Sequence, residues 1–171
     1  MPLSVYQGSA LVPGMGSAVY TAEHDLQGLI YGSPHHALYV THALVSGAAR
    51  DAGNTDDTTV LRPGLVMAVI TATQKWIQFT SGAVDGSEIP RGILTEFGLA
   101  TQSDGANADR FLATIMVGGN VNPAAMCIAS TAAYGIDQVT ASHVAIRKAF
   151  ALSFRFSDDF MGIIGVPIAN R

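Results

Sequence analysis

The pattern of hydrophobic and polar residues is clearest in the middle of the chain, where it predicts three consecutive β-strands. A turn at Arg62–Gly64 precedes the apolar run Leu65–Thr71, whose length and β-branched residues indicate a strand covered on both faces. Residues Lys75–Phe79 alternate between the two faces and complete a β-hairpin. A polar connection with the turn signal Asp85-Gly86 leads to a third strand at Ile93–Phe97. No nucleophile stands beside a base here, so we interpret this stretch as a scaffold.

Flanking segments add further strands, joined by polar connections. The same pattern predicts strands at Leu29–Tyr31, at His35–Val45 and at Arg110–Val117, the last ending in Gly118-Gly119. Small polar residues at Ser46–Thr59 predict a surface loop.

One segment, Ser142–Leu152, predicts a helix. Ser142 is suited to capping its N-terminus, and Arg147 and Lys148 are expected to face water. The apolar stripe that would pack against the sheet consists of Ala145, Ile146, Ala149, Phe150 and Leu152.

The order of motifs in the central stretch resembles the lambda-like head decoration proteins of tailed bacteriophages. The matching segments are Ile70–Trp76 (ITATQKW), Asp85–Glu88 (DGSE) and Gly92–Leu94 (GIL). The family usually has Gly where this chain has Gln74, from which we expect a different turn type within the same fold. The resemblance implies one mainly β (α+β) domain over residues 29–171, resembling a β-sandwich or β-barrel and carrying one or two short helices. An extended N-terminal arm over residues 1–28 precedes it.

The two ends of the chain are apolar but lack a clear periodic pattern. Residues 1–28 fit either a flexible terminus or an arm that becomes ordered on a partner, and the resemblance favours an arm that contacts the major capsid protein. Its anchors would be Tyr6, Leu11, Val12, Met15, Val19 and Tyr20. The C-terminal segment is expected to be a core strand or, by preference, the interface of a homotrimer, formed by Ile163, Ile164, Val166 and Ile168.

Composition narrows the range of partners. Charged residues make up 13% of the chain, against about 25% in typical domains, which indicates that partners cover much of the surface. The net charge is −4 and the basic residues are scattered, so we expect no nucleic-acid partner. The sequence lacks an apolar run of about 18 residues and an evident signal peptide, so we expect no membrane partner. The single cysteine, Cys127, predicts a buried, inert thiol in a protein made in a reducing cytosol.

Candidate chemistry is sparse. His36 and His42 share a strand face but lie roughly 20 Å apart at strand rise, so surface or interface histidines are favoured over a zinc site. The loop around Asp51 lacks the closing Glu of a calcium loop. The sequence contains neither a Gly-x-Ser-x-Gly nor a His-Glu-x-x-His motif, so we expect no enzyme, no metal and no cofactor.

What the resemblance implies about function is a decoration, or cement, protein. Such a protein would be made in the host cytoplasm and bind the outer surface of the expanded head of the virion as a trimer. It would stabilise the shell against the pressure of packaged DNA. The alternatives are a β-rich cellular or virion binding module for carbohydrate or peptide and, less favoured, an enzyme whose site assembles only in space.

Overall fold

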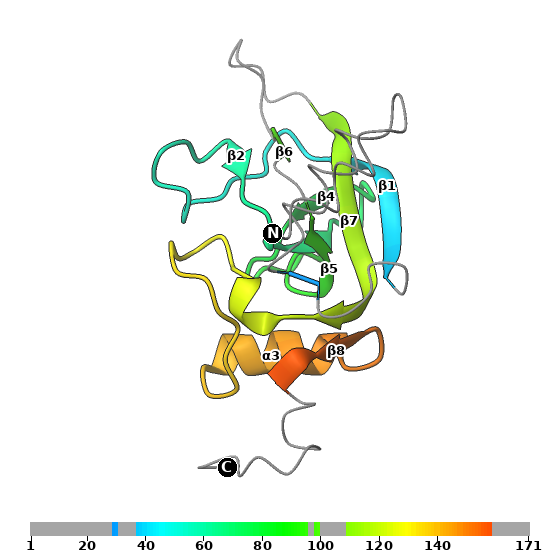
Figure 1. Ribbon diagram of the computed structural model, residues 1–171. Coiled ribbons are helices and arrows are strands. Elements are labelled where there is room, and N and C mark those ends of the chain that lie inside the picture. Colours follow the sequence, from blue (N-terminus) through cyan, green and yellow to red (C-terminus); the bar gives the residue numbers. More distant parts are fainter. Residues whose placement is uncertain (1–28, 31–36, 96–97, 100–108, 159–171) are drawn as a thin grey trace, which may run out of the picture.

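A ring of hydrogen-bonded strands forms the centre of the computed structural model, which describes residues 29–30, 37–95, 98–99 and 109–158 (Figure 1). The elements are β1 (Leu38–Val45), β2 (Val60–Leu61), β3 (Val66–Val69), β4 (Trp76–Gln78), β5 (Pro90–Leu94), β6 (Gly98–Leu99), β7 (Arg110–Val121), the 3-10 helix η2 (Pro123–Ala125), α3 (Ala141–Phe150) and β8 (Phe154–Phe156). The described part of the chain has no helix long and apolar enough to cross a membrane.

The ring closes because β1 pairs with two strands. The strand order is β1-β4-β3-β5-β7, and β1 also pairs with β7 in antiparallel fashion. The contact between β1 and β4 is parallel and joins Val45 to Trp76. β8 continues the sheet beyond β7, and β2 and β6 form a separate small ladder. The prediction of a mainly β, barrel-like fold with one or two short helices is confirmed.

The predicted hairpin is present as β3 and β4. Met67 pairs with Gln78 and Val69 with Trp76. In the connection, Gln74 has a φ of +57°, the left-handed region that glycine adopts most readily. Gln74 therefore adopts a conformation that is uncommon for a residue with a side chain, and the expected difference in turn type from the family stays a prediction.

Strand β7 passes through the glycine pair at which we expected it to end. Up to Gly118 it pairs with β1, and from Gly119 it pairs with β8. Gly119 has a φ of +131°, and a Cβ there would lie 2.7 Å from Cε of Met116. Glycine thus lets β7 bend toward α3 and change partners without ending (Figure 1).

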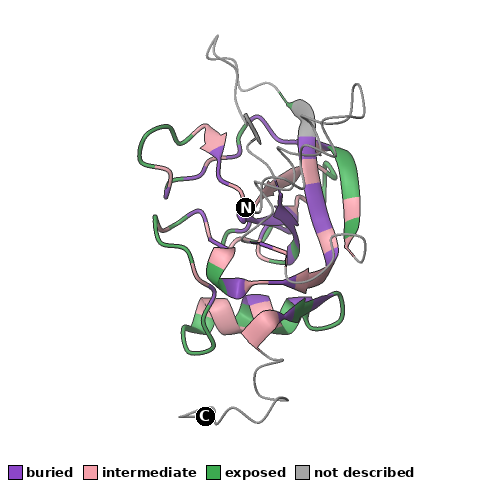
Figure 2. Ribbon diagram, viewed as in Figure 1, coloured by how far each residue is buried: buried purple, intermediate pink, exposed green. Residues whose placement is uncertain are grey.

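Two groups of buried residues cover both faces of the central strands. Neighbours along a strand belong to different groups: Val66 and Met67 on β3, and Ile93 and Leu94 on β5. One group joins β1, β3, β5 and β7, and the other lies between β3, β5, β7, β8 and α3 (Figure 2). The prediction that the strand following Gly64 is covered on both faces is confirmed.

Helix α3 is present, but its cap and its buried stripe differ from the prediction. It begins at Ala141 after Thr140, not after Ser142. Ile146 and Phe150 are buried as expected, whereas Leu152 lies beyond the helix and is fully exposed. The exposed stripe members also include Ala145 and Ala149. Two buried residues, Ile146 and Phe150, therefore anchor the ten-residue helix.

Other predicted segments need smaller corrections. The third strand begins at Pro90, earlier than expected. Near Leu29, the described residues form one isolated bridge, between Ile30 and Val121. Ser46–Thr59 is a loop, but Asp51 within it is completely buried, so it is not simply a surface loop.

Candidate functional site

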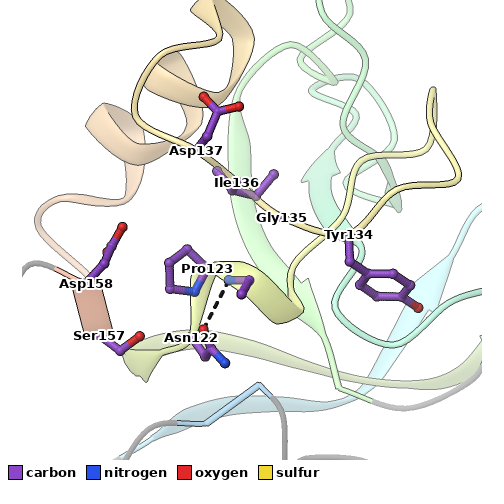
Figure 3. A pocket seen from close by; sticks show the side chains of 9 residues that line it. Asn122, Pro123, Tyr134, Gly135, Ile136, Asp137, Ser157 and Asp158 are labelled. Atoms are coloured by element: carbon purple, nitrogen blue, oxygen red, sulfur yellow. Dashed lines mark hydrogen bonds between the residues drawn. The ribbon is translucent and has the colours of Figure 1, made fainter. Parts of the chain in front are cut away.

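A pocket with a volume of about 560 Å³ lies where η2, the segment before α3 and the end of β8 meet (Figure 3). Figure 3 shows Ser157 and Asp158 on one side and Tyr134 on the other, with Pro123 between them. The lining residues are Asn122, Pro123, Ala124, Tyr134, Gly135, Ile136, Asp137, Ser157 and Asp158. The volume falls within the range of about 300–1,000 Å³ that is usual for ligand sites.

The floor of this pocket is set by the turn that ends β7. Asn122 is the N-cap of η2, and its Oδ1 accepts a hydrogen bond of 3.1 Å from the Ala124 N–H. Pro123 fixes the first position of η2, where it needs no N–H donor. The backbone N–H of Ile136 donates to the Pro123 carbonyl at 2.9 Å. This bond holds the lining segment around Ile136 against η2.

The carboxylate of Asp137 organises the start of α3. It accepts hydrogen bonds from the Val139 N–H at 2.7 Å, from both the N–H and the hydroxyl of Thr140, and it lies 3.0 Å from Nδ1 of His143. These donors, led by the Thr140 N–H, lower the pKa of Asp137. Asp137 thus orders the turn that leads into α3, whereas the N-cap residue Thr140 makes no side-chain capping bond and the cap expected at Ser142 is not formed.

The second carboxylate of the pocket, Asp158, is also paired within the chain. Its Oδ1 lies 2.6 Å from Nη2 of Arg147, and its Oδ2 accepts a hydrogen bond from Gln138 at 3.2 Å. The Arg147 guanidinium also lies over the Phe156 ring, 4.2 Å from its centroid. Arg147 was expected to face water, but it instead links α3 to β8.

These contacts limit what the pocket can do chemically. Both carboxylates already interact with donors of their own chain. Much of the remaining lining is apolar: Pro123, Ala124 and Ile136. Within the described ranges, no group of three or more His, Cys, Asp or Glu side chains is placed to hold a metal ion. Of the three apolar lining residues, Pro123 and Ile136 are buried within the chain and Ala124 is exposed, so the lining presents only a small apolar surface.

A second polar cluster lies around Arg62 and is structural. Asp51 is fully buried and forms a two-point ion pair with Arg62. The guanidinium also lies 5.3 Å from the centroid of the Tyr134 ring. Burial raises the pKa of the nearby Cys127 thiol to about 12, so the thiol is inert, as predicted.

The site residues predicted from the sequence lie outside the described residues. This applies to the proposed capsid anchors Tyr6, Leu11, Val12, Met15, Val19 and Tyr20, and to the proposed trimer contacts Ile163, Ile164, Val166 and Ile168. His36 is also outside, whereas His42 is exposed on β1 with a φ of +57°. Sequence reasoning missed the pocket because three separate segments form it. The available signal was Asp137, a capping residue type shortly before a predicted helix.

Comparison with protein-family models, with curated proteins and with solved structures finds no match.

Proposed function

We propose that this chain is a head decoration protein of a tailed bacteriophage. It binds the outer surface of the expanded head as a homotrimer, contacts the major capsid protein and stabilises the shell. One observation carries the proposal: the three segments that resemble the family form a single interlocked unit in the fold.

The first and second segments are joined at the end of the β3–β4 hairpin. The Thr71 N–H donates to the Asp85 carbonyl at 2.8 Å. Gly86 has a φ of +104°, and a Cβ at this position would lie 2.4 Å from Oγ1 of Thr71 and 2.6 Å from the carbonyl oxygen of Val69. The DGSE segment therefore fits against the ITATQKW segment only with glycine at this position.

The third segment meets the first across the barrel strands. A Cβ on Gly92 would lie 2.5 Å from Cγ2 of Ile115 and 3.3 Å from Cζ3 of Trp76. Gly92 also pairs with Met67 in the ladder between β3 and β5. Segments separated along the sequence thus depend on one another in space, which gives the resemblance more weight than isolated short motifs would have.

The chemistry of the described surface supports a role based on surface burial. The carboxylates of the pocket form hydrogen bonds and an ion pair within their own chain. Charged residues make up only 13% of the chain. A protein that binds only the expanded shell stabilises it by RT ln(1+[L]/Kd) per site. Three arms on one trimer act as linked ligands, whose combined affinity exceeds that of a single arm.

The test is binding to expanded heads that lack the protein, taken from the phage that encodes the chain. We expect saturable co-sedimentation with expanded heads, little with unexpanded ones, and a higher temperature of DNA release after addition. Light scattering should give a mass near three times 17.8 kDa. A monomer that does not co-sediment with expanded heads would overturn the proposal and favour the carbohydrate- or peptide-binding alternative.

The arm is tested separately by deletion of residues 1–28. The shortened chain should still form trimers but bind expanded heads far more weakly, because its anchors are gone. Undiminished binding by the shortened chain would remove the arm from the mechanism and leave the decoration role intact.

A further inference from the structure

We infer that the pocket beside η2 binds a neutral sugar, a ligand with several hydroxyl groups and no charge. This activity is separate from the proposed decoration role and does not depend on it. The polar side chains of the lining carry the inference: an amide, hydroxyls and a carboxylate keep unused hydrogen-bonding capacity near a half-exposed aromatic ring.

The amide of Asn122 and the hydroxyl of Ser157 come together where β7 and β8 end. The two strands are parallel and Val121 pairs with Phe156, so the next residue of each strand leaves the ladder at the same level. Neighbouring strands lie about 4.8 Å apart. Figure 3 shows the two side chains close together in the lining. One small ligand can therefore contact both.

The chain's own hydrogen bonds leave several of these groups unused. Asn122 accepts through Oδ1 from the Ala124 N–H, and its Nδ2 has no partner among the described residues. The hydroxyls of Ser157 and Tyr134 likewise form no hydrogen bond within that part of the chain. Amide N–H groups donate, whereas hydroxyls both donate and accept. The pocket thus offers a ligand donors as well as acceptors.

The charges of the pocket select a neutral ligand. Asp158 accepts one bond at each oxygen, from Arg147 and from Gln138, and a carboxylate has about four acceptor positions, so it can also accept from a ligand. An anion would be repelled by Asp158 and Asp137, and a cation would leave the Asn122 amide without an acceptor. A sugar hydroxyl both donates and accepts, so it suits all of these groups.

Tyr134 supplies an aromatic surface at the edge of the pocket. A bridge to Cys127 holds its backbone, and the Arg62 guanidinium lies over its ring, 5.3 Å from the centroid. Arg62 is buried whereas Tyr134 is 48% exposed, so the ring face opposite Arg62 is open to solvent. The C–H face of a sugar ring can pack on that aromatic face, which removes apolar surface from water.

Saturation-transfer difference NMR on the full-length chain tests the pocket with defined probes, the methyl glycosides of glucose, galactose, mannose and N-acetylglucosamine. We expect saturable binding of at least one of them. The corresponding uronic acid, in which a carboxylate replaces the hydroxymethyl group, should bind much more weakly. No binding of any neutral probe would overturn the inference. Equal or tighter binding of the uronic acid would also overturn it, because the site would then not select a neutral ligand.

Pocket variants locate the binding. In Asn122→Asp a carboxylate oxygen can still accept from the Ala124 N–H, but the Nδ2 donor is gone, so we expect a loss of affinity of about tenfold or more. Ser157→Ala should weaken binding by about two- to tenfold. Gln74→Glu makes the same amide-to-carboxylate change at an exposed position outside the lining and should have no effect. Thermal unfolding checks that each variant folds.

The outcomes separate this inference from the decoration role. Unchanged affinity in both Asn122→Asp and Ser157→Ala would place sugar binding outside the pocket and overturn the inference. Lost sugar binding by an Asn122→Asp chain that still binds expanded heads would support it and assign the two activities to different surfaces. Sugar binding by a wild-type chain that does not bind heads would also support it, while removing the decoration role.

Discussion

Asp51 and Arg62 form a buried two-point ion pair between the loop before β2 and the turn before β3. Oδ2 of Asp51 accepts from Nε of Arg62 at 2.7 Å, and Oδ1 accepts from Nη2 at 2.9 Å. Arg62 also donates to the carbonyl oxygens of Thr131 at 2.7 Å and Ala132 at 2.8 Å. One guanidinium thus joins three segments of the fold.

Removing one partner of this pair should strongly destabilise the fold. In Asp51→Ala the Arg62 charge stays buried without its carboxylate, so we expect a loss of about 3–5 kcal/mol in the free energy of unfolding. Urea denaturation measures it. Arg91→Ala, at an exposed position on β5, is the control and should change stability by less than about 0.5 kcal/mol. Equal effects of the two substitutions would contradict a structural role for the pair.

Substitution of two glycines with positive φ, Gly82 and Gly86, can distinguish the cost of backbone strain from the cost of a steric clash. Gly82 has a φ of +83° with nothing within 4 Å of a Cβ, so Gly82→Ala tests the left-handed backbone alone, at about 1–2 kcal/mol. Gly86→Ala adds a clash with Thr71 and Val69, and we expect a further loss of about 1–3 kcal/mol. Denaturant midpoints of both variants decide this. Similar losses would mean that the DGSE segment does not press on the hairpin.

Gln74 offers a stabilising substitution. Because its φ is +57°, Gln74→Gly removes the cost of a left-handed side-chain residue, and we expect a gain of up to about 1 kcal/mol. The lost hydrogen bond from Nε2 of Gln74 to the Thr71 carbonyl is exposed, so it offsets little. Gln74→Val should destabilise, since β-branched residues tolerate this region poorly. Thermal unfolding of the two variants should therefore shift in opposite directions.

Asp137 should make stability sensitive to acid. Hydrogen bonds to its charged form lower its pKa in the folded chain, so its contribution is present above the ordinary carboxyl pKa of about 4 and is lost as pH falls through the lower folded value. Asp137→Asn should reduce the loss of stability between about pH 5 and pH 2. Some loss should remain, because Asp57, Asp85 and Asp109 also have lowered pKa values.

The control for this experiment is Asp56→Asn, at an exposed position in the loop before β2. It should keep the acid dependence of the wild type in urea titrations at several pH values. An Asp137→Asn variant with the wild-type dependence would show that the hydrogen bonds from Val139 and Thr140 do not distinguish the charged form.

The local parts of the fold could be predicted from the sequence because their signals are local. The apolar run after Gly64, the alternation through Trp76 and the Asp85-Gly86 turn each specify a strand or a turn within a few residues. Burial of Cys127 followed from its apolar neighbours in the same way.

The resemblance implied a barrel-like fold, but the strand pairings that close the barrel and the segments that form the pocket could not be predicted, because both depend on residues far apart in the sequence. Nothing near Leu44 in the sequence shows that it pairs with Phe111. Asp51 looked like a surface residue because its partner, Arg62, lies in a different turn. The passage of β7 through Gly119 depends on its change of partner from β1 to β8, which a glycine pair alone does not reveal.

Barrel closure also determines how other chains can approach. Because β1 bonds to both β4 and β7, every strand of the ring has neighbours on both sides. The ring therefore offers an incoming peptide less free edge than an open sheet would, which limits edge-to-edge aggregation, although β1 pairs with β4 only at Val45. In the described sheet, the open edge belongs to β8, which is only three residues long. Copies crowded side by side would therefore recognise one another largely through side chains, and growth by strand addition in this sheet would be restricted to β8 and the β4 side of β1.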